Sequence, residues 1–448
     1  MLLDDANTKL TARYVQQKTA RLEQTNPVHR HRSSWHIIRE LTSTNTVPYS
    51  KVPGGTTEQR LNIWFEHFKS LLGSEQPTPD LSIPFFNQRV ADNLPISCKP
   101  FCALELEVVL KSLNSSKSPG LDNIPPSVWK LPSLHDDLLT FCNKALIDGN
   151  IPKAWTTTSI IPIPKKGDLT NPNNYRGISL APVAAKIFNK LLLNRIYPHI
   201  DPLLRPNQNG FRRGRSTLPQ ILALRRIIEE CKIGNRSAAI VFVDFSKAFD
   251  SINRAAMFHI LSLYGIPPAI IRAIKLLYES SFSRVQTADG LTDFFKTLGG
   301  VLQGDTLAPF LFIIVLDYVL RNCMSEENGL TIRPRQSRRV PSVKVTDLDF
   351  ADDLALLSDT IQQAQKLVRD LEHAAKLTGL SMNASKTEHM AVNIAPEESS
   401  LSSVSGDIIE RVEDFKYLGS YISESSSKDF NTREGMAWLY PISKNPTR

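Results

Sequence analysis

Residues 347–357 read DLDFADDLALL, and this stretch places two adjacent carboxylates, Asp352 and Asp353, between two apolar segments. A buried carboxylate without a partner is costly, and two neighbouring carboxylates also repel each other. The apolar residues on either side predict a strand–turn–strand hairpin. One interpretation of the pair is a polar turn, with both aspartates solvated at its tip. The other is that a divalent cation neutralises them.

The length and composition of the chain are typical of a folded, intracellular protein. Its 448 residues allow two or three domains or one large multi-lobed enzyme, and 41% of them are hydrophobic, enough for a substantial core. The five cysteines form no CxxC pair and have no accompanying histidine spacing, so we expect buried thiols in a reducing compartment. The first residues do not resemble a secretory signal, and no apolar run approaches the roughly 18 residues that span a bilayer. We therefore expect a nuclear or cytoplasmic protein without a membrane partner.

The positive charge of the chain is concentrated in one tract. The net charge is +8, but residues 161–240 contain 14 Lys and Arg against 4 Asp and Glu. This tract alone carries +10, so the remaining residues sum to −2. A concentrated basic tract in an otherwise balanced chain is typical of a protein that binds a polyanion. The alternative is a solvated basic face.

The apolar patterns predict helices and strands that interleave without a strict β–α–β rhythm, which favours an α+β fold. A Pro- and Ser-rich linker is expected near residues 73–84, after an N-terminal helical region. The expected helices lie within residues 61–73, 103–114, 184–196, 219–232, 305–320 and 367–379, and the expected strands within 159–164, 238–243, 343–358 and 415–423.

Three carboxylates stand at an expected strand end or hairpin tip, and these are Asp244, Asp352 and Asp353. A hard cation such as Mg²⁺ prefers oxygen ligands and usually keeps waters, which leaves room for substrate phosphates. A strand-end aspartate beside a hairpin-tip pair suits two such ions ~3.5–4 Å apart, the separation used in phosphoryl transfer. One ion would activate an attacking hydroxyl, and the other would stabilise the leaving oxygen. This chemistry favours the cation interpretation of the pair.

Nine sequence blocks carry a resemblance to a known family. VFVDFSKAFD, GVLQGDTLAP, FADD, GLSMNASKT and FKYLG occur in the order and spacing of a reverse transcriptase. KSPGLDNIP, IIPIPKKGD, NYRGISL and QNGFRRGRST resemble the fingers motifs of non-LTR (LINE-type) retrotransposon polymerases. The resemblance covers nearly the whole chain, most firmly from Ser159 to Ser423. It implies a right-hand polymerase with fingers and a ferredoxin-like α+β palm.

The resemblance also implies an activity, cofactors and partners. The chain would be an RNA-directed DNA polymerase that extends a DNA primer with deoxynucleoside triphosphates on an RNA template. It would use two Mg²⁺ ions, with Mn²⁺ as a substitute. One alternative is a catalytically weak or inactive remnant that only binds nucleic acid, and another is a relative of group II intron maturases or telomerase. An RNA-dependent RNA polymerase is disfavoured, because Phe249 and FADD depart from the pattern of those enzymes.

Carried over residue by residue, the resemblance assigns the metal ligands to Asp244 and Asp352, with Asp353 as the second member of the hairpin pair. Phe249 would be a steric gate against a ribose 2′-hydroxyl, or alternatively a core aromatic. Lys386 would protonate the departing pyrophosphate, or is alternatively an ordinary surface lysine. The residues assigned to the incoming nucleotide are Lys165, Lys166, Arg176, Phe249, Gln303 and Gly304.

Two further groups of residues are assigned to nucleic acid. Arg212, Arg213 and Arg215 resemble a contact to the template backbone, and the alternative is that these arginines pair internally with acidic side chains. The hairpin residues assigned to the primer are Tyr417, Leu418 and Gly419, for which the alternative is a plain structural turn.

One residue of the fingers motifs departs from the family pattern. Gly177 stands where the family usually has proline, which we expect to loosen the turn that presents Arg176.

We expect an N-terminal helical extension and linker at residues 1–85 and an upstream fingers extension at 86–155. The fingers and palm would occupy 156–423, and 424–448 would be the truncated start of a thumb.

Overall fold

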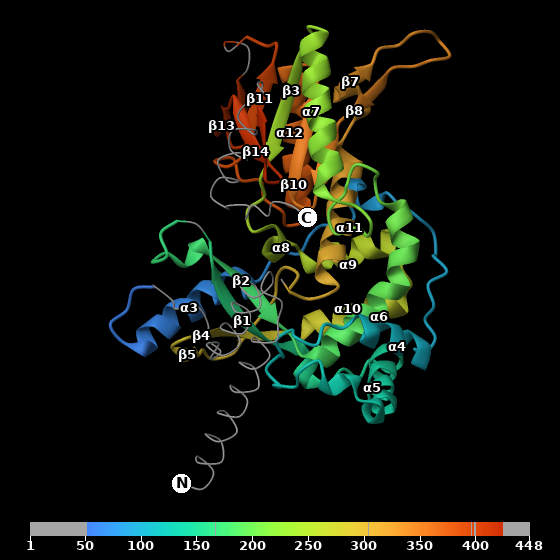
Figure 1. Cartoon of the computed structure of the whole chain (residues 1–448), viewed down its shortest axis with the longest axis vertical. Helices are drawn as coiled ribbons and strands as arrows, with labels where there is room; N and C mark the ends of the chain where they lie inside the picture. The colour runs from blue at the N-terminus through green and yellow to red at the C-terminus, as the bar shows by residue number, and fades with distance from the viewer. Residues whose placement is uncertain (1–51, 166, 303, 396, 398–399, 424–448) are drawn as a thin grey trace, which may run out of the picture.

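A six-stranded sheet lies at the centre of the upper part of the molecule (Figure 1). The computed structural model describes residues 52–423, except 166, 303, 396, 398 and 399. The strand order is β12-β13-β11-β3-β10-β9, with β3 antiparallel to both of its neighbours. The strands are β3 (Ala238–Val243), β9 (Asp347–Phe350), β10 (Asp353–Ser358), β11 (Glu388–Val392), β12 (Leu401–Ser402) and β13 (Ile408–Arg411).

Both faces of this sheet are covered, as the side chains of β3 show. Val241 and Val243 join one core with helices α11 (Ala308–Cys323) and α12 (Ile361–Leu377). Ile240 and Phe242 point to the other face, because side chains alternate along a strand. Helix α7 (Thr217–Ile233) and the hairpin of β14 (Asp414–Tyr417) and β15 (Ser420–Ser423) cover that second face. All six residues of β3 are therefore buried.

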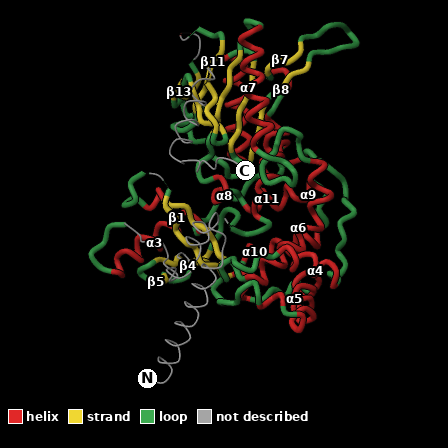
Figure 2. The backbone as a smooth tube through the Cα atoms, viewed as in Figure 1, coloured by secondary structure: helices red, strands yellow, loops and turns green. Residues whose placement is uncertain are grey.

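A second, five-stranded sheet lies below the first, to the left in Figure 2. It joins segments far apart in the sequence, because β1 pairs antiparallel with β2 and parallel with β4. Helix α3 (Thr57–Leu72) covers it with Trp64 and Phe68. Its strands are β1 (Thr157–Pro164), β2 (Tyr175–Leu180), β4 (Phe282–Thr287), β5 (Gly290–Leu291) and β6 (Phe295–Lys296).

The remaining helices pack mainly to the right of the two sheets in Figure 1. They are α4 (Ala103–Ser112), α5 (His135–Ile147), α6 (Val183–Ile200), α8 (Ala248–Ser251), α9 (Arg254–Leu263) and α10 (Pro268–Glu279). Short 3₁₀ helices span Pro84–Asn87, Val128–Lys130, Pro132–Leu134, Lys153–Thr156, Pro172–Asn174, Asp201–Leu203 and Glu326–Asn328. A further hairpin is formed by β7 (Leu330–Arg333) and β8 (Val343–Val345). The mixture of sheets and helices agrees with the predicted α+β class.

Some sequence expectations differ from the structure. The expected linker at residues 73–84 is anchored, since the amide of Gln76 donates to the carbonyl of Ser251 and the amide of Asn253 donates to the carbonyl of Pro77. All five cysteines are free, but only Cys142, Cys231 and Cys323 are buried, while Cys98 is half-buried and Cys102 is exposed. None of the described helices has the length and apolar character needed to span a bilayer. The expected start of a thumb and most of the N-terminal extension lie outside the described residues.

Candidate active site

The three predicted carboxylates lie at one edge of the six-stranded sheet. Asp244 directly follows β3, Asp352 ends the turn between β9 and β10, and Asp353 begins β10. Leu354 pairs with Val243 across β10 and β3, so the turn lies beside the end of β3. Strand pairing therefore brings Asp244 close to Asp352 and Asp353, which lie more than 100 positions later in the sequence.

These carboxylates influence one another electrostatically. Burial raises the pKa of Asp244, and the nearby Asp352 adds to this rise while Lys386 opposes it. Burial also raises the pKa of Asp352, which Arg176 partly offsets. Asp353 reaches the surface, yet desolvation, followed by the charges of Asp352 and Asp244, raises its pKa to about 6. The site therefore holds concentrated negative charge that a cation would stabilise.

The donor set fits a hard divalent cation, because it consists of carboxylate oxygens that repel one another without an ion between them. Within the residues that the structure describes, no three His, Cys, Asp or Glu side chains already converge on one point as a metal centre. The carboxylates of Asp244, Asp352 and Asp353 thus share one region without converging.

Cationic side chains approach the carboxylates from the five-stranded sheet and from the loop before β11. Lys165 follows β1, and Arg176 lies on β2 opposite Ile163. Burial and the charge of Arg176, and then of Lys386, lower the pKa of Lys165. The Nζ atom of Lys386 lies 4.0 Å from Oδ2 of Asp244. Cations therefore approach the acidic edge from two lobes, one built on the six-stranded sheet and the other on the five-stranded sheet. The predicted nucleotide contact Lys166 lies outside the described residues.

Phe249 occupies a position that serves packing and leaves part of its ring exposed. It lies on α8 and stacks on Phe312 of α11, with ring centroids 4.6 Å apart and planes at 15°. Phe211 meets the same ring edge-on, at 6.0 Å. Since the Phe249 ring is only partly buried, the structure is compatible with both sequence interpretations, a steric gate and a core aromatic.

The backbone of Gly304 lies close to another part of the protein. Its φ is 102°, and an added Cβ would lie 2.6 Å from the carbonyl oxygen of Ser179 on β2. The glycine thus allows the turn before α11 to pack against the five-stranded sheet. A contact of Gly304 with the incoming nucleotide stays a prediction, and Gln303 lies outside the described residues.

The three predicted template arginines have different environments. Arg212 is buried, and its Nε lies 2.7 Å from Oδ1 of Asp201. Its other nitrogen atoms donate to backbone carbonyls, so Arg212 does not fit a phosphate contact, and the internal-pairing alternative holds for it. Arg213 is exposed over the ring of Tyr197, and Arg215 is exposed beside Asn209. These last two arginines remain candidates for template contact.

Two further expectations are corrected by packing. Tyr417 is buried, and its hydroxyl donates to the carbonyl of Leu348 at 2.9 Å, so it fixes the β14–β15 hairpin to the sheet instead of offering a primer contact. Leu418 and Gly419 form the two-residue turn of that hairpin, both with positive φ. Gly177 lies inside strand β2 and not in a turn, and an added Cβ would lie 2.5 Å from the ring of Phe68.

Gln208 is a residue of this site that the sequence analysis missed. Its buried side chain donates to the carbonyl of Ala351 and accepts hydrogen bonds from the N–H groups of Ala351 and Gly210, at 3.1, 2.7 and 2.7 Å. Ala351 has a φ of 59° and directly precedes Asp352. Gly210 allows the close approach, because a Cβ there would lie 2.1 Å from the nitrogen of Ala351. Gln208 therefore holds the backbone of the acidic turn.

A buried charge cluster beneath the turn was also missed. Arg205 lies 2.5 Å from Oδ1 of Asp347 and 3.6 Å from Oδ2 of Asp349. Burial and then the charge of Asp347 raise the pKa of Asp349, while Arg205, acting against burial, lowers the pKa of Asp347. The alternation of DLDF places both carboxylates on one face of β9, which is the signal that could have indicated the cluster.

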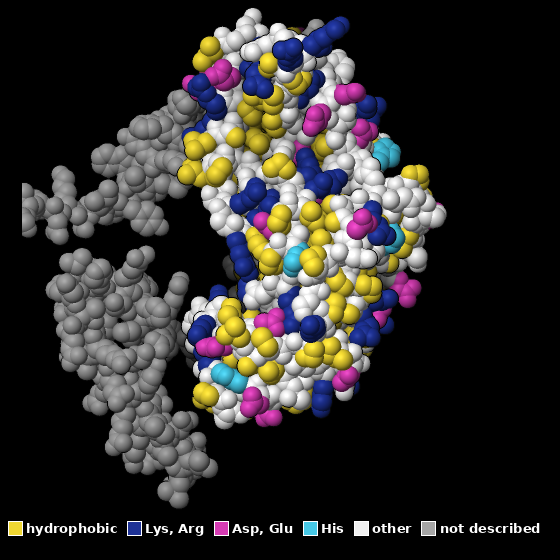
Figure 3. Space-filling model, turned by 90° about the vertical axis from the view of Figure 1, so that its right-hand side faces the viewer, with side chains coloured by type: hydrophobic (Ala, Val, Ile, Leu, Met, Phe, Trp, Pro, Cys, Tyr) yellow, Lys and Arg dark blue, Asp and Glu magenta, His cyan; other side chains and the backbone are white. Residues whose placement is uncertain are grey.

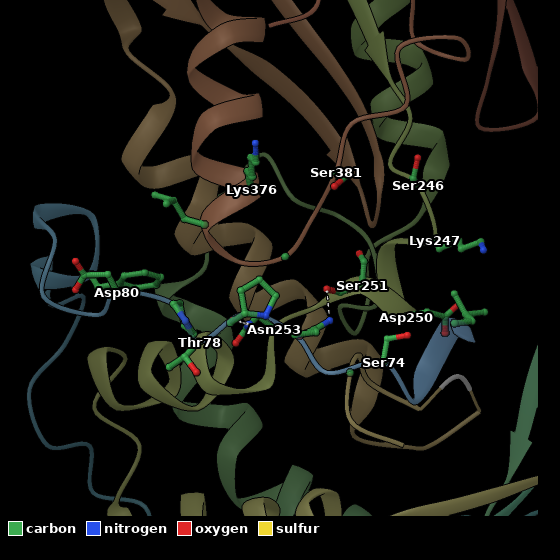
Figure 4. A pocket seen from close by; sticks show the side chains of 18 of the residues that line it. Ser74, Thr78, Asp80, Ser246, Lys247, Asp250, Ser251, Asn253, Lys376 and Ser381 are labelled. Carbon is green, nitrogen blue, oxygen red and sulfur yellow. Dashed lines mark hydrogen bonds between the residues drawn. The ribbon is translucent and has the colours of Figure 1, made fainter. Parts of the chain in front are cut away.

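A cavity of about 680 Å³ adjoins the loop that follows Asp244 (Figure 4). Its walls come from the anchored segment 74–80, from residues 246–253 and from the end of α12 near Lys376. The labelled side chain of Lys247 comes from the loop just before α8, and that of Asp250 comes from α8 itself. None of the three predicted carboxylates lines this cavity, so the acidic edge and the cavity are separate features.

Comparisons with known proteins extend these observations. Residues 163–422, more than half of the chain, match the family model described as "Reverse transcriptase (RNA-dependent DNA polymerase)". A Pol polyprotein from the type-1 retrotransposable element R2 of Popillia japonica is 26% identical over 359 residues, which cover 78% of this chain and 49% of the relative. The R2DM polyprotein of Drosophila melanogaster is 27% identical over 387 residues, covering 80% of this chain and 35% of the relative.

A third relative is the RNA-directed DNA polymerase from mobile element jockey of Drosophila funebris, 26% identical over 424 residues. The match covers 88% of this chain and 43% of that relative. The chain thus spans half or less of the length of these curated relatives.

Proposed function

The chain belongs to the reverse transcriptase family, with similarity to the polymerases of non-LTR retrotransposons, and on this basis we propose that it acts as an RNA-directed DNA polymerase. It extends the 3′-hydroxyl of a DNA primer with deoxynucleoside triphosphates on an RNA template. The observation that supports this most is the meeting of Asp244, Asp352 and Asp353 at one sheet edge, opposite cations of the other lobe. In this proposal, the six-stranded sheet is the palm and the five-stranded sheet belongs to the fingers.

Asp244 and Asp352 would hold Mg²⁺, with Asp353 beside them. When bound, such ions activate the primer hydroxyl and stabilise the charge on the leaving phosphate. The protein's own cations supply the rest of the charge balance. Lys165 and Arg176 bind triphosphate oxygens, for which the guanidinium offers a two-pronged contact and the ammonium a point charge.

Other residues select and position the substrates. Lys386 lies at the edge of the acidic group, where its ammonium donates a proton to the departing pyrophosphate. The exposed part of the Phe249 ring excludes a ribose 2′-hydroxyl. Arg213 and Arg215 contact template phosphates, which gives affinity without sequence preference. The turn at Leu418 and Gly419 contacts the primer.

Primer extension by the purified chain, with a short DNA primer annealed to an RNA template, tests this function. Asp352→Asn keeps the side-chain shape but removes a charge that faces the reacting phosphate. We expect extension to fall roughly 10²-fold or more, since losing one group that stabilises transition-state charge typically costs that much. Binding of the template–primer should hold or improve, because phosphate repulsion decreases.

The matched control is Asp148→Asn, an exposed aspartate after helix α5, which should change neither activity nor binding. Equal loss of binding and extension in Asp352→Asn would identify a structural carboxylate. A wild-type chain that binds template–primer but never extends it would instead support the nucleic-acid-binding remnant.

A further inference from the structure

The β7–β8 hairpin extends from the upper lobe, away from the five-stranded sheet (Figure 1). Its tip, residues 334–342, reads PRQSRRVPS. Strand β8 continues through Thr346 into β9, and β9 ends at the acidic turn that contains Asp352. The tip of the hairpin therefore lies beyond the end of β9 that is opposite to the carboxylates.

The hairpin carries concentrated and unpaired positive charge. Residues 330–346 contain no Asp or Glu. Four arginines are exposed, and no ion pair joins them to any acidic group among the described residues: Arg333, Arg335, Arg338 and Arg339. Lys344, at the base of the hairpin, differs because it lies 3.7 Å from Asp359. Four neighbouring unpaired cations repel one another, a cost that a bound polyanion would remove.

The tip is a formed turn, so the arginines are presented on an ordered backbone. The N–H of Gln336 donates to the carbonyl of Val340 at 3.1 Å. The Ser337 hydroxyl accepts from the N–H groups of Arg339 and Val340, both at 3.2 Å. The Nε of Arg335 donates to the carbonyl of Ser337 at 3.2 Å. At the base, Leu330 pairs with Val345 as a two-stranded antiparallel ribbon.

We propose that this hairpin binds the phosphate backbone of double-stranded DNA outside the polymerisation site. Arginine matches this chemistry, since its planar fork pairs with two phosphate oxygens at once. The segment from Ile332 to Val343 has no aromatic residue, whereas sites for unpaired strands typically stack bases on aromatic rings. A two-stranded ribbon fits the wide major groove of B-form DNA, while the deep, narrow major groove of A-form RNA excludes it.

The end of the molecule that carries the hairpin is accessible in the space-filling view. Figure 3 shows several Lys and Arg side chains near the top of that face, with acidic side chains beside some of them. Contact there would add a second region of DNA binding to the one at the acidic edge. This binding goes beyond the proposed polymerase activity, because it requires neither the carboxylates nor a bound nucleotide.

The test replaces Arg333, Arg335, Arg338 and Arg339 by Gln and measures binding of a labelled B-form duplex at several salt concentrations. Each lost phosphate contact lowers the slope of log affinity against log salt by about 0.9, so four contacts lower it by about 3 to 4 units. The substitutions lie on an exposed turn, so a melting curve should match that of the wild type.

A control variant removes the same charge elsewhere, at four other exposed cations: Arg89, Lys111, Lys153 and Lys275. Its slope should stay near that of the wild type. If the two variants have equal slopes, the arginines act only through net charge and the proposal is wrong. If the hairpin variant loses binding to single-stranded RNA as much as to duplex DNA, the assignment to duplex DNA is overturned.

Primer extension on a short pre-annealed template–primer separates this proposal from the polymerase function. The hairpin variant should extend such a substrate at the wild-type rate, because the duplex is too short to reach the hairpin. A chain that fails to extend any primer would refute the polymerase function, while the duplex-binding titration would still decide the role of the hairpin.

Discussion

Replacing Gln208 by Met gives a direct test of how the acidic turn is held. Methionine keeps roughly the length and volume of the side chain but provides neither the amide donor nor the carbonyl acceptor. The N–H and carbonyl of Ala351 and the N–H of Gly210 then lose their partners from Gln208. The variant therefore removes three hydrogen bonds from a buried site with little change in volume.

The expected magnitude follows from these contacts. Each buried backbone group that loses its partner costs about 1–3 kcal/mol, so three groups cost about 3 kcal/mol at the low end. Holding Ala351 at a φ of 59° costs roughly 1–2 kcal/mol, which the Gln208 contacts outweigh in the wild type. Without them the balance reverses, and the turn that carries Asp352 should relax.

Amide hydrogen exchange measures this relaxation directly. A loss of about 3 kcal/mol corresponds to exchange at Ala351 up to ~10²-fold faster, since 1.4 kcal/mol is a factor of ten. Primer extension should fall through kcat, because the carboxylates lose their position, while template–primer binding should change little. The affinity of the variant for Mn²⁺, measured by electron paramagnetic resonance of the ion, should also decrease.

The matched control is Gln220→Met. Gln220 is also buried and donates to the carbonyls of Asn207 and Asp349, and not to Ala351. It should lower thermal stability while leaving exchange at Ala351 and the metal affinity near wild type. If both variants lose activity in proportion to their loss of stability, Gln208 is an ordinary core residue and the positioning role is refuted.

Three other predictions concern the same site. Phe249→Ala should raise the ratio of ribonucleotide to deoxyribonucleotide incorporation in single-nucleotide extension assays, and an unchanged ratio would make Phe249 a packing residue. The raised pKa of Asp353, about 6, means that the folded state binds its proton more tightly than the unfolded state, so stability should fall as pH rises from about 4 to 6. Asp353→Asn should therefore melt at a higher temperature than wild type at pH 7.5, with the difference vanishing below pH 4. Arg212→Ala should lower the melting temperature. The double variant of Arg213 and Arg215 should instead reduce the slope of log affinity against log salt for template RNA by roughly 1.5 units. A reduced slope in Arg212→Ala, or a lowered melting temperature in the double variant, would contradict these assignments.

Local patterns in the sequence predicted the elements that bring the acidic residues together. The apolar run before Asp244 indicates a buried strand, and the apolar arms around Asp352 indicate a hairpin. Each pattern predicts its own element, and antiparallel pairing of the hairpin with the buried strand then places the turn beside the strand end. Similarly, the pattern of Trp64 and Phe68 correctly indicated helix α3, although not the sheet that it covers.

Other features had no local signal. The pairing of β1 with β4 joins residues separated by more than 100 positions, and nothing within either strand specifies the partner. Arg212 was assigned to nucleic acid because QNGFRRGRST resembles a fingers motif, but its carboxylate partner Asp201 lies eleven positions earlier. Gln208 is neutral, and no pattern of charged residues in the sequence indicates the three hydrogen bonds that it makes.

The parallel pairing of β1 and β4 has a consequence for how the chain folds during synthesis. Helix α3 and β1 are made early, yet the strands that complete their sheet end at Lys296. At about 5–20 residues per second, the ribosome needs roughly 10 to 45 s to extend the chain from Leu72 to Lys296. Until β4 is made, the sheet that Trp64 and Phe68 cover stays incomplete, so this lobe folds late, and a nascent chain arrested before β4 should be the species most dependent on chaperones.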